Sequence, residues 1–455
     1  MSRAVIWFRR DLRLADHPAL SAAVAEYDEV VPLFVVDPKL VEASGAPRLA
    51  YMIDALKNLD DSLGRALVYR HGDPLRIAPE FAAEVGATAV FVSEDFGPYG
   101  RRRDDAVADA LRAEGRTLNL VGSPYAVRPG TVVKDDGTPY SVFTPFSKRW
   151  LQSGWLPPLD VPDLARVVGA PQIRCDGPLA RPDIDLELPP VSEAAVWEQW
   201  TEFRDRGSDG LDGYKERRND PSVNGSSRLS AALRWGLVHP RQLLADLRGG
   251  SDHDHYRSEL CWREFYADVL FRHPDTGWRN LNRRMDAMVH DEGEVARERF
   301  AAWCRGETGY PIVDAGMREL NTTGWMHNRV RMIVASFLVK DLHLPWQWGA
   351  RYFMQHLVDG DLASNSHGWQ WTAGTGTDAA PYFRVFNPVL QGERYDPAGD
   401  YVRRFVPELA DLPAPQIHSP WAKGRGVPLG YVAPIVDHSH ERDEALARYK
   451  AVTGG

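Results

Sequence analysis

The stretch AVIWF at residues 4–8 sets the pattern for the first part of the chain, because it is short, apolar and followed by a helical interval. Four more such runs continue the rhythm: VVPLFVV at 30–36, ALVYR at 66–70, TAVFVS at 88–93 and LNLV at 118–121. Strands that alternate with helices in this way indicate a parallel sheet built from βαβ units. No G-x-G-x-x-G motif follows the first strand, so the sequence does not predict an ordinary dinucleotide site.

A proline-rich, irregular segment from Thr138 to about Ser192 follows and is typical of a connector between two units. Beyond it helical periods dominate, as in SELCWREFYADVLF at 258–271 and RVRMIVASFLVKDL at 329–342. We therefore predict an α/β domain with a parallel Rossmann-like sheet, a long connector and an all-α domain. Their predicted bounds are residues 1–130, 131–195 and 196–455.

Composition excludes several classes of protein. The longest apolar run, MIVASFLV at 332–339, is too short to span a membrane, and the N-terminus does not resemble a signal peptide, so we expect a cytoplasmic protein without a membrane partner. Three scattered cysteines, Cys175, Cys261 and Cys304, favour neither disulfides nor structural zinc. A net charge of -9 means that any nucleic-acid binding needs a local basic face.

The segment NGSSRLS at 224–230 leads into a helical pattern. Taken alone, it most simply predicts a serine that caps a helix. It is also compatible with a pyrophosphate held by free backbone N–H groups and serine hydroxyls at a helix start.

In SELCWREFY the residues Glu259, Trp262 and Arg263 are spaced to share one helix face. A solvated ion pair and a carboxylate in a partly dry cleft explain this pattern equally well. In GWMHNRVRM, Asn328 and Met332 are one turn apart and Arg331 lies near them, whereas Arg329 points about 100° away from them. Asparagine suits a base edge and methionine an adaptable apolar contact.

The stretch DGDLASNSHGWQW at 359–371 contains two acids and two tryptophans. Trp369 and Trp371 point about 200° apart on a helix, so one is expected to face inward and the other toward solvent or a substrate. Asp359 and Asp361 would repel each other unless an arginine or a polar ligand edge satisfies them.

These motifs, together with VIWFRRDLRLADHPAL at 5–20, TGYPIVDAGMREL at 308–320 and TGTDAAPYFRVFNP at 375–388, occur in the order of the photolyase/cryptochrome family. The chain most closely resembles class I cyclobutane pyrimidine dimer photolyases. The resemblance implies an N-terminal antenna domain and a helical domain that holds a U-shaped FAD. Arg331 would pair with Asp359, and Asn365 would face flavin N5. The residues implied in cofactor binding are Tyr214, Ser226, Ser227, Arg228, Leu229, Ser230, Arg331, Asp359, Gly360, Asp361 and Asn365.

The implied substrate is UV-damaged DNA, bound by a monomer that flips the dimer out of the duplex; photolyases are among the known base-flipping enzymes. Glu259 and Asn328 would hydrogen-bond the dimer, and Trp262, Trp371 and Met332 would pack on it. Arg263 belongs to the same expected surface. Arg218, Arg329 and Arg384 match positions that contact phosphates.

The resemblance implies light-driven chemistry, in which excited FADH⁻ passes an electron to the dimer, two cyclobutane bonds break and the electron returns. Trp369 would begin a tryptophan relay that re-reduces oxidised flavin, followed by Trp346. Gly293 stands where the family has its distal tryptophan, so Trp303 or a nearby tyrosine is expected to end the relay. His367, in a position where the family has glycine, could alter the electrostatics near the flavin.

The antenna segment EDFGPYGRRRD at 94–104 resembles members that bind 8-hydroxydeazaflavin, since folate-binding members (methenyltetrahydrofolate) carry glutamate at the position of Gly100. Two alternative functions remain: a cryptochrome-type light sensor and a (6-4) photolyase. Two features count against the sensor. Plant cryptochromes have aspartate at the position of Asn365, and this chain ends at ALARYKAVTGG, residues 445–455, with no long tail.

Overall fold

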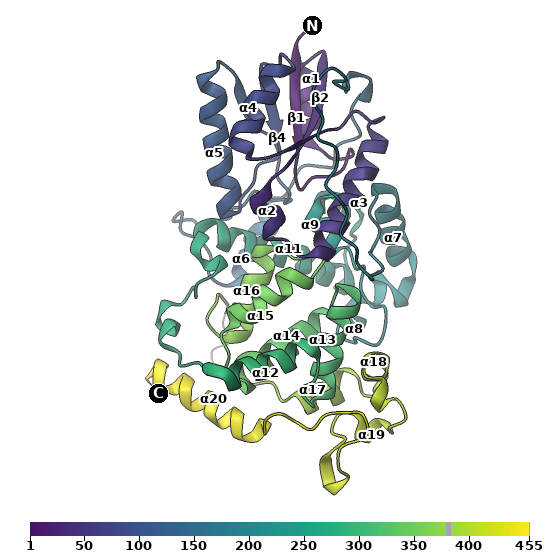
Figure 1. The fold of residues 1–455 in the computed structure, drawn as a ribbon, viewed down its shortest axis with the longest axis vertical. Coiled ribbons are helices and arrows are strands. Elements are labelled where there is room, and N and C mark those ends of the chain that lie inside the picture. The colour runs from purple at the N-terminus through teal and green to yellow at the C-terminus, as the bar shows by residue number, and fades with distance from the viewer. Residues whose placement is uncertain (379–383, 455) are drawn as a thin grey trace. The chain divides into compact units, whose positions relative to one another are not determined.

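The computed structural model describes residues 1–378 and 384–454 and contains two compact units (Figure 1). Unit 1 consists of residues 1–184, 188–202 and 227–274, and unit 2 of residues 185–187, 203–226 and 275–455. The chain passes between the two units several times. Each unit therefore combines segments that are distant in sequence.

Unit 1 contains a five-stranded parallel sheet with the strand order β3-β2-β1-β4-β5 (Figure 1). Ala4 of β1 lies opposite Val30 of β2 and Ala89 of β4, so the first predicted strand is the centre of the sheet. The predicted parallel sheet is confirmed. Its strands are β1 (Arg3–Phe8), β2 (Glu29–Val36), β3 (Val68–His71), β4 (Ala89–Val92) and β5 (Thr117–Leu120).

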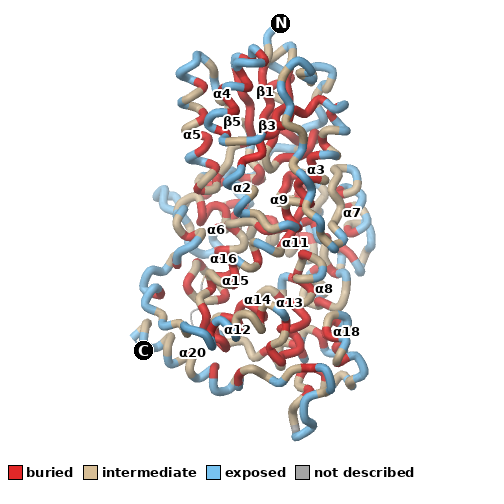
Figure 2. The backbone as a smooth tube through the Cα atoms, in the orientation of Figure 1, coloured by how far each residue is buried: buried red, intermediate tan, exposed pale blue. Residues whose placement is uncertain are grey.

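Helices cover the sheet because its inner strands β1, β2 and β4 are apolar and buried (Figure 2), apart from the first residues Arg3 and Glu29. Ile77 and Phe81 of α4 and Val107 of α5 join one buried cluster with strand residues such as Val5 and Val31. The helices of unit 1 are α1 (Pro18–Glu26), α2 (Pro38–Glu42), α3 (Ala46–Ser62), α4 (Pro74–Glu84), α5 (Pro98–Ala113), α6 (Phe143–Ser153), α9 (Ser230–Trp235), α10 (Pro240–Asp246) and α11 (Ser251–Arg272).

The compact units do not follow the domain bounds predicted from the sequence. Helix α6 lies within the predicted connector, and α11, predicted for the helical domain, packs in unit 1. The physical reason is visible in two contacts: Trp150 Nε1 donates to Glu264 at 2.6 Å, and the ring of Phe143 stacks on Trp262. Composition marks the proline-rich segment but not these long-range contacts.

Unit 2 is helical and its core includes three buried tryptophans, Trp303, Trp346 and Trp369. Its helices are α8 (Tyr214–Arg217), α12 (Gly293–Arg305), α13 (Pro311–Thr323), α14 (Asn328–Ser336), α15 (Trp346–His356), α16 (Leu362–Ala373), α17 (Pro388–Tyr395), α18 (Asp400–Phe405), α19 (Ala414–Ile417) and α20 (His438–Thr453), while α7 (Glu193–Asp205) spans the boundary between the units.

The predicted helix at 329–342 changes its form part-way. Helix α14 ends at Ser336 and a π-helical turn, η6, follows at Phe337–Asp341. Such turns are rare and often occur at functional sites. Among the described residues, no helix combines the length and the apolar character needed to cross a membrane.

Candidate functional site

Helix α16 places Asn365 and Trp369 one turn apart on the same face. Asp361 caps the helix, because its Oδ1 accepts from the backbone N–H of Ser364 at 3.2 Å. Nδ2 of Asn365 donates to the carbonyl of Ala350 at 2.9 Å. This bond orients the amide, so the acceptor Oδ1 is the atom of Asn365 that is left for a ligand.

Trp369 is 3% exposed and packs against Gly349 of α15. A Cβ at Gly349 would lie 2.1 Å from the indole ring, so only glycine allows this close approach. Trp371 is only partly buried, which confirms that the two tryptophans of this helix differ in environment.

The expected pair of Arg331 and Asp359 is present. Nη2 of Arg331 donates to Oδ2 of Asp359 at 2.8 Å, and its Nε donates to the carbonyl of Met326 at 2.8 Å. The Asp359 side chain is 3% exposed. Within residues 1–378 and 384–454, Oδ1 of Asp359 has no hydrogen-bond partner. A buried carboxylate oxygen of this kind is costly unless a ligand donates to it.

The opposite face of α16 is fastened to the segment 276–281. Oγ of Ser366 donates to the carbonyl of Gly277 at 2.8 Å, and Nε2 of Gln370 donates to the carbonyl of Thr276 at 2.7 Å. His367 is 1% exposed; its Nδ1 bonds the carbonyl of Ala363 at 2.8 Å and its Nε2 bonds Oγ1 of Thr276 at 3.0 Å.

A carbonyl only accepts, so Nδ1 of His367 carries the proton and Nε2 accepts from the Thr276 hydroxyl. The side chain therefore packs two positions away from Asn365, about 200° round the helix. His367 thus holds the segment that follows α11, and its effect on the flavin stays a prediction.

Trp303 packs beside Trp369, and Trp346 belongs to the same buried cluster. The ring centroid of Trp303 is 6.1 Å from that of Trp369, and Nε1 of Trp303 donates to the carbonyl of Val334 at 3.0 Å. The ring of Tyr352 lies 5.8 Å from Trp303. Trp346, which begins α15, donates from Nε1 to Oδ1 of Asn280 at 2.8 Å. The rings of Trp369, Trp303 and Tyr352 therefore lie in succession, each within about 6 Å of the next.

The start of α14 presents Asn328, which is exposed, and Met332, which is half-buried. His327 caps the helix by accepting from the N–H of Arg329, as suits a packed histidine. Arg329 donates to Oδ1 of Asn219 at 2.7 Å and lies over the ring of Tyr395 at 4.5 Å. These contacts hold the guanidinium of Arg329 in one orientation.

Tyr214 begins α8 and is buried, with the guanidinium of Arg218 5.4 Å from its ring centroid. Ser226 lies in the same unit and is half-buried. Arg384 is exposed, and its carbonyl accepts from Nζ of Lys340. The neighbouring residues 379–383 of that motif lie outside the described residues.

In unit 1 residues 227–229 precede α9, which begins at Ser230. No side chain caps this helix, so the serine cap that the sequence most simply predicted is not formed. Arg228 has a φ of 52°, a left-handed conformation that side chains rarely adopt and that occurs preferentially at ligand clamps. Oγ of Ser227 bonds the hydroxyl of Tyr256 at 2.9 Å, and burial keeps that phenol protonated by raising its pKa.

Helix α11 carries Glu259, Trp262 and Arg263, all half-buried. One face of Trp262 is already covered, because Phe143 stacks on it with a centroid distance of 3.6 Å. Arg263 donates to the carbonyls of Pro124 and Leu233 at 3.0 and 3.1 Å. These contacts hold Arg263 in place, and Glu259 and Trp262 are the half-buried members of this face beside it.

Two family models match the chain. Residues 4–163 match the model described as DNA photolyase, and residues 256–451 match the FAD binding domain of DNA photolyase. The chain belongs to the DNA photolyase family. The expected family is thereby confirmed, and so is the FAD-binding domain. The part of the chain matched to FAD binding contains the Arg331–Asp359 pair and the whole of α16.

The similarity extends over the full length. The chain is 40% identical to the deoxyribodipyrimidine photo-lyase of Escherichia coli, covering 100% of both sequences. Among solved structures, a class III photolyase from Agrobacterium tumefaciens is 37% identical to this chain, with a TM-score of 0.87. The match covers 100% of this chain and 98% of the Agrobacterium chain.

Two further structures are more distant in sequence. An archaeal photolyase from Sulfolobus tokodaii with two FAD molecules is 29% identical with a TM-score of 0.85, covering 99% and 100% of the two chains. A cryptochrome from Synechocystis is 28% identical with a TM-score of 0.88, covering 98% and 99%.

The residues present fit a flavin. Within the described parts of the chain, Oδ1 of Asp359 is a buried acceptor without a partner, and Nε1 of Trp369 is a buried donor without one. A flavin edge carries both N–H donors and carbonyl acceptors.

Sequence reasoning missed several residues that support the site. Asn280 accepts a hydrogen bond from Trp346. The two residues are 66 positions apart, so no local sequence pattern indicates this contact. Phe143 stacks on Trp262. It lies in the segment predicted to be an irregular connector, so the sequence did not indicate this contact. Tyr256 could have been found, because it lies three residues before Glu259 and shares its helix face.

Proposed function

We propose that the chain is a light-driven DNA repair enzyme that splits cyclobutane pyrimidine dimers. The observation that carries the proposal is the α16 face with Asn365 and Trp369, together with the buried Arg331–Asp359 pair, in a chain similar over its full length to a deoxyribodipyrimidine photo-lyase. FAD, when bound in its reduced form, supplies the electron that light excites. The protein supplies geometry and charge.

The chain's own residues divide the work. Asp359 and Arg331 hold the cofactor's polar edge, Asp361 fixes the start of α16, and Asn365 offers Oδ1 as an acceptor. Glu259 and Asn328 hydrogen-bond the flipped dimer. Its rings pack on Trp371, Met332 and the free edge of Trp262. Arg218, Arg329 and the exposed Arg384 serve the DNA phosphates.

A second part of the proposal concerns the relay. When oxidised flavin is re-reduced, Trp369 is the first residue to give up an electron. Trp346 or Trp303 then passes an electron to oxidised Trp369. The short separation of Trp303 and Trp369, 6.1 Å between centroids, supports a branch that continues to Tyr352.

For the antenna we favour 8-hydroxydeazaflavin over methenyltetrahydrofolate. A Cβ at Gly100 would lie 2.1 Å from Oδ2 of Asp95, a carboxylate that accepts from Arg103. A glutamate at this position would have to displace that carboxylate. The structural relative with two FAD molecules leaves a second FAD as an outcome of the test. A monomer acting in the cytoplasm stays a prediction from the sequence.

An absorption spectrum of the purified protein, followed by repair of a dimer-containing oligonucleotide under blue light, tests the function. We expect flavin bands, an antenna band and loss of dimers only in the light. A flavoprotein that binds the oligonucleotide without repairing it would be a light sensor, the alternative represented by the Synechocystis relative. Repair of (6-4) products alone would assign the second alternative.

Replacement of Glu259 by alanine is expected to lower the repair yield per absorbed photon while FAD stays bound. Loss of a hydrogen bond to a charged group removes about 1.5–3 kcal/mol, here from the dimer that transiently carries negative charge. Quantum yield at saturating substrate is the measurement. Glu259→Gln, which can still donate, should recover part of the yield; an unchanged yield in Glu259→Ala would contradict the assignment.

Replacement of Trp371 by alanine is expected to weaken binding to dimer-containing DNA by about 1–3 kcal/mol, the usual contribution of base–aromatic stacking. Binding to undamaged DNA should change less. Titration of both DNAs by fluorescence anisotropy measures the difference. Trp278→Ala serves as the matched control, because Trp278 is also an accessible tryptophan, 50% exposed. Equal losses on both DNAs would make Trp371 structural.

A further inference from the structure

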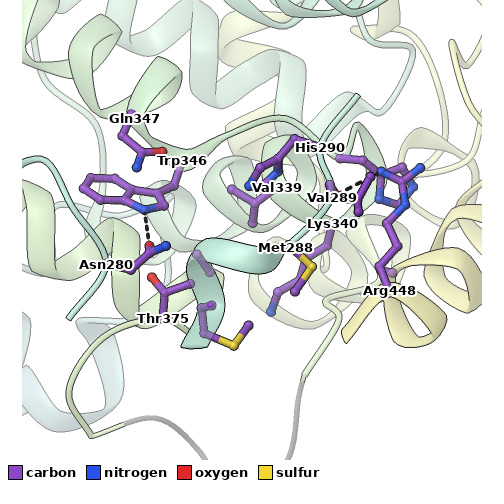
Figure 3. A pocket seen from close by; sticks show the side chains of 14 residues that line it. Asn280, Met288, Val289, His290, Val339, Lys340, Trp346, Gln347, Thr375 and Arg448 are labelled. Atoms are coloured by element: carbon purple, nitrogen blue, oxygen red, sulfur yellow. Dashed lines mark hydrogen bonds between the residues drawn. The ribbon is translucent and has the colours of Figure 1, made fainter. Parts of the chain in front are cut away.

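A cavity in unit 2 lies between helix α15, the π-helical turn η6 and helix α20 (Figure 3). Two of its lining residues connect it with the motif at 375–388. Thr375 begins that motif, and Lys340 donates a hydrogen bond from Nζ to the carbonyl of Arg384, a later residue of the motif. Both described parts of the motif are thus attached to other segments of unit 2.

The first described part of the motif is fixed where the chain leaves α16. The N–H of Thr375 donates to the carbonyl of Gln370 at 2.9 Å, and the carbonyl of Thr375 accepts from the N–H of Asn282 at 2.9 Å. Gln370 is itself fully buried and donates to the carbonyl of Thr276 at 2.7 Å. Backbone contacts therefore set the direction of the chain after α16.

The second described part, residues 384–387, is attached to the end of α14 and to η6. Oγ of Ser336 accepts from the N–H of Phe386 at 3.4 Å, and Lys340 donates to the carbonyl of Arg384. Ser336 and Lys340 are four positions apart, so they lie about one helical turn from each other on the same side. These two side chains hold the segment that carries Arg384.

The element that provides both contacts also carries other residues of the proposed site. Helix α14 begins at Asn328, proposed to bond the dimer, and continues through Arg331, which pairs with the buried Asp359. Ser336 ends α14, and η6 adds Lys340. One helical rod therefore fixes the groups proposed for the dimer, the cofactor and the phosphate relative to one another.

The amine of Lys340 is in an unusual place for a lysine. The residue is 5% exposed, and burial lowers the pKa of the amine to about 7, although the carboxylate of Asp341 raises it. A buried amine is costly unless it makes hydrogen bonds, and the apolar cavity residues Met288 and Val339 would suit a methionine equally well. The bond to Arg384 gives the amine a use at this position.

We infer that Lys340 is a positioning residue for DNA binding, which holds the backbone at Arg384 so that the Arg384 guanidinium meets a DNA phosphate. The inference rests on the proposed function, because it assigns Arg384 to a phosphate. A segment that is already held in place loses less conformational entropy when DNA binds. Phosphate contacts carry no sequence information, so the anchor strengthens binding to damaged and undamaged DNA alike.

The first test compares DNA affinity with repair in the FAD-loaded protein. Lys340→Met keeps the length of the side chain but removes the donor. By fluorescence anisotropy, its Kd for a dimer-containing oligonucleotide should rise roughly three- to tenfold, the usual effect of one lost hydrogen bond. The repair quantum yield at saturating DNA, the flavin content and the melting temperature should not fall, because Lys340 acts through Arg384 and not on the dimer or the flavin.

Two further variants separate position from charge. Lys450→Met removes an exposed lysine of α20, makes the same change in net charge and should bind DNA as the wild type does. Lys340→Arg keeps a donor and should recover most of the affinity. The centre of a water molecule can move through about 50 Å³ of the adjoining cavity, so the larger side chain has room.

A double-mutant cycle tests whether Lys340 acts through Arg384. In an Arg384→Ala background, Lys340→Met should weaken DNA binding much less than in the wild type, because the guanidinium that it positions is gone. An unchanged Kd in Lys340→Met, an equal loss in Lys450→Met, or an equal loss in both backgrounds would overturn the inference. So would a loss of affinity accompanied by a lower melting temperature and lower flavin content.

A second measurement needs no DNA. Hydrogen exchange of the free protein, followed by mass spectrometry, should be several times faster for peptides covering 384–390 in Lys340→Met than in the wild type and Lys450→Met. Equal exchange in the three proteins would show that Lys340 does not anchor the segment. If the wild type binds no dimer-containing DNA, the proposed function fails, while the exchange result still decides whether the anchor exists.

Discussion

Trp369→Phe should leave FAD bound and reduce photoreduction of the oxidised flavin by an order of magnitude or more. Phenylalanine is far harder to oxidise than an indole, so the first step of the relay is lost. The fold should tolerate the change, because Nε1 of Trp369 has no hydrogen-bond partner among the described residues. FAD should stay bound because only one of the groups proposed to contact it is lost, while Arg331, Asp359 and Asn365 remain. The missing ring leaves a void beside Gly349, at a cost below the roughly 3–5 kcal/mol of an alanine substitution.

Repair by chemically reduced enzyme separates this result from general damage. The repair electron goes to the dimer without using the tryptophans, so Trp369→Phe should repair normally once it is reduced with dithionite. Steady illumination with flavin absorbance measures photoreduction, and dimer loss measures repair. Normal photoreduction in Trp369→Phe would contradict the whole relay.

The two branches can be compared in the same assay. Trp346→Phe should lower photoreduction less completely than Trp369→Phe, because Trp303 still contacts Trp369 at 6.1 Å. Trp303→Phe should shorten the radical lifetime if the branch through Trp303 and Tyr352 carries charge. An unchanged lifetime and yield in Trp303→Phe would remove that branch and leave Trp346 as the only outlet.

Asp359→Ala should cause the second large effect, loss of FAD during purification. The carboxylate is buried and paired with Arg331, and its Oδ1 is the acceptor proposed for the cofactor. Loss of a hydrogen bond to a charged group costs about 1.5–3 kcal/mol, which corresponds to a cofactor bound roughly ten- to a hundredfold less tightly. The ratio of flavin absorbance to protein absorbance measures it.

Glu408→Ala is the matched control for Asp359→Ala. Glu408 accepts from Arg318 at 2.9 and 3.0 Å in the same unit, but both side chains are partly exposed. This variant should keep its FAD. Asp359→Asn keeps the shape without the charge and should hold FAD with intermediate affinity; full FAD content in Asp359→Ala would show that the free Oδ1 does not face the cofactor.

Several features of the site follow from local sequence. The spacing of Trp369 and Trp371 predicts different environments, and the structure has Trp369 buried and Trp371 partly exposed. The pairing of Arg331 with Asp359 was implied by the resemblance and is present. The inner strands are readable as apolar runs because they are buried on both faces.

Other features needed the tertiary structure. One of them is the pair of contacts of His367, whose ring nitrogens bond Ala363 and Thr276. Phe143 covers one face of the Trp262 ring, and Arg263 donates hydrogen bonds to two backbone carbonyls. Each of these contacts joins a helix to a segment whose position no periodicity encodes.

The sequence by itself determined the parallel sheet, the helical character of the second half and the family, because strand and helix periods and ordered motifs are local properties of the chain. The tertiary structure decided the makeup of the compact units, the placement of Trp303 beside Trp369 and the cavity that Trp346 shares with Thr375 and Lys340. These depend on packing between segments far apart in the chain, where several side chains compete for the same space and only the folded arrangement shows which of them meet.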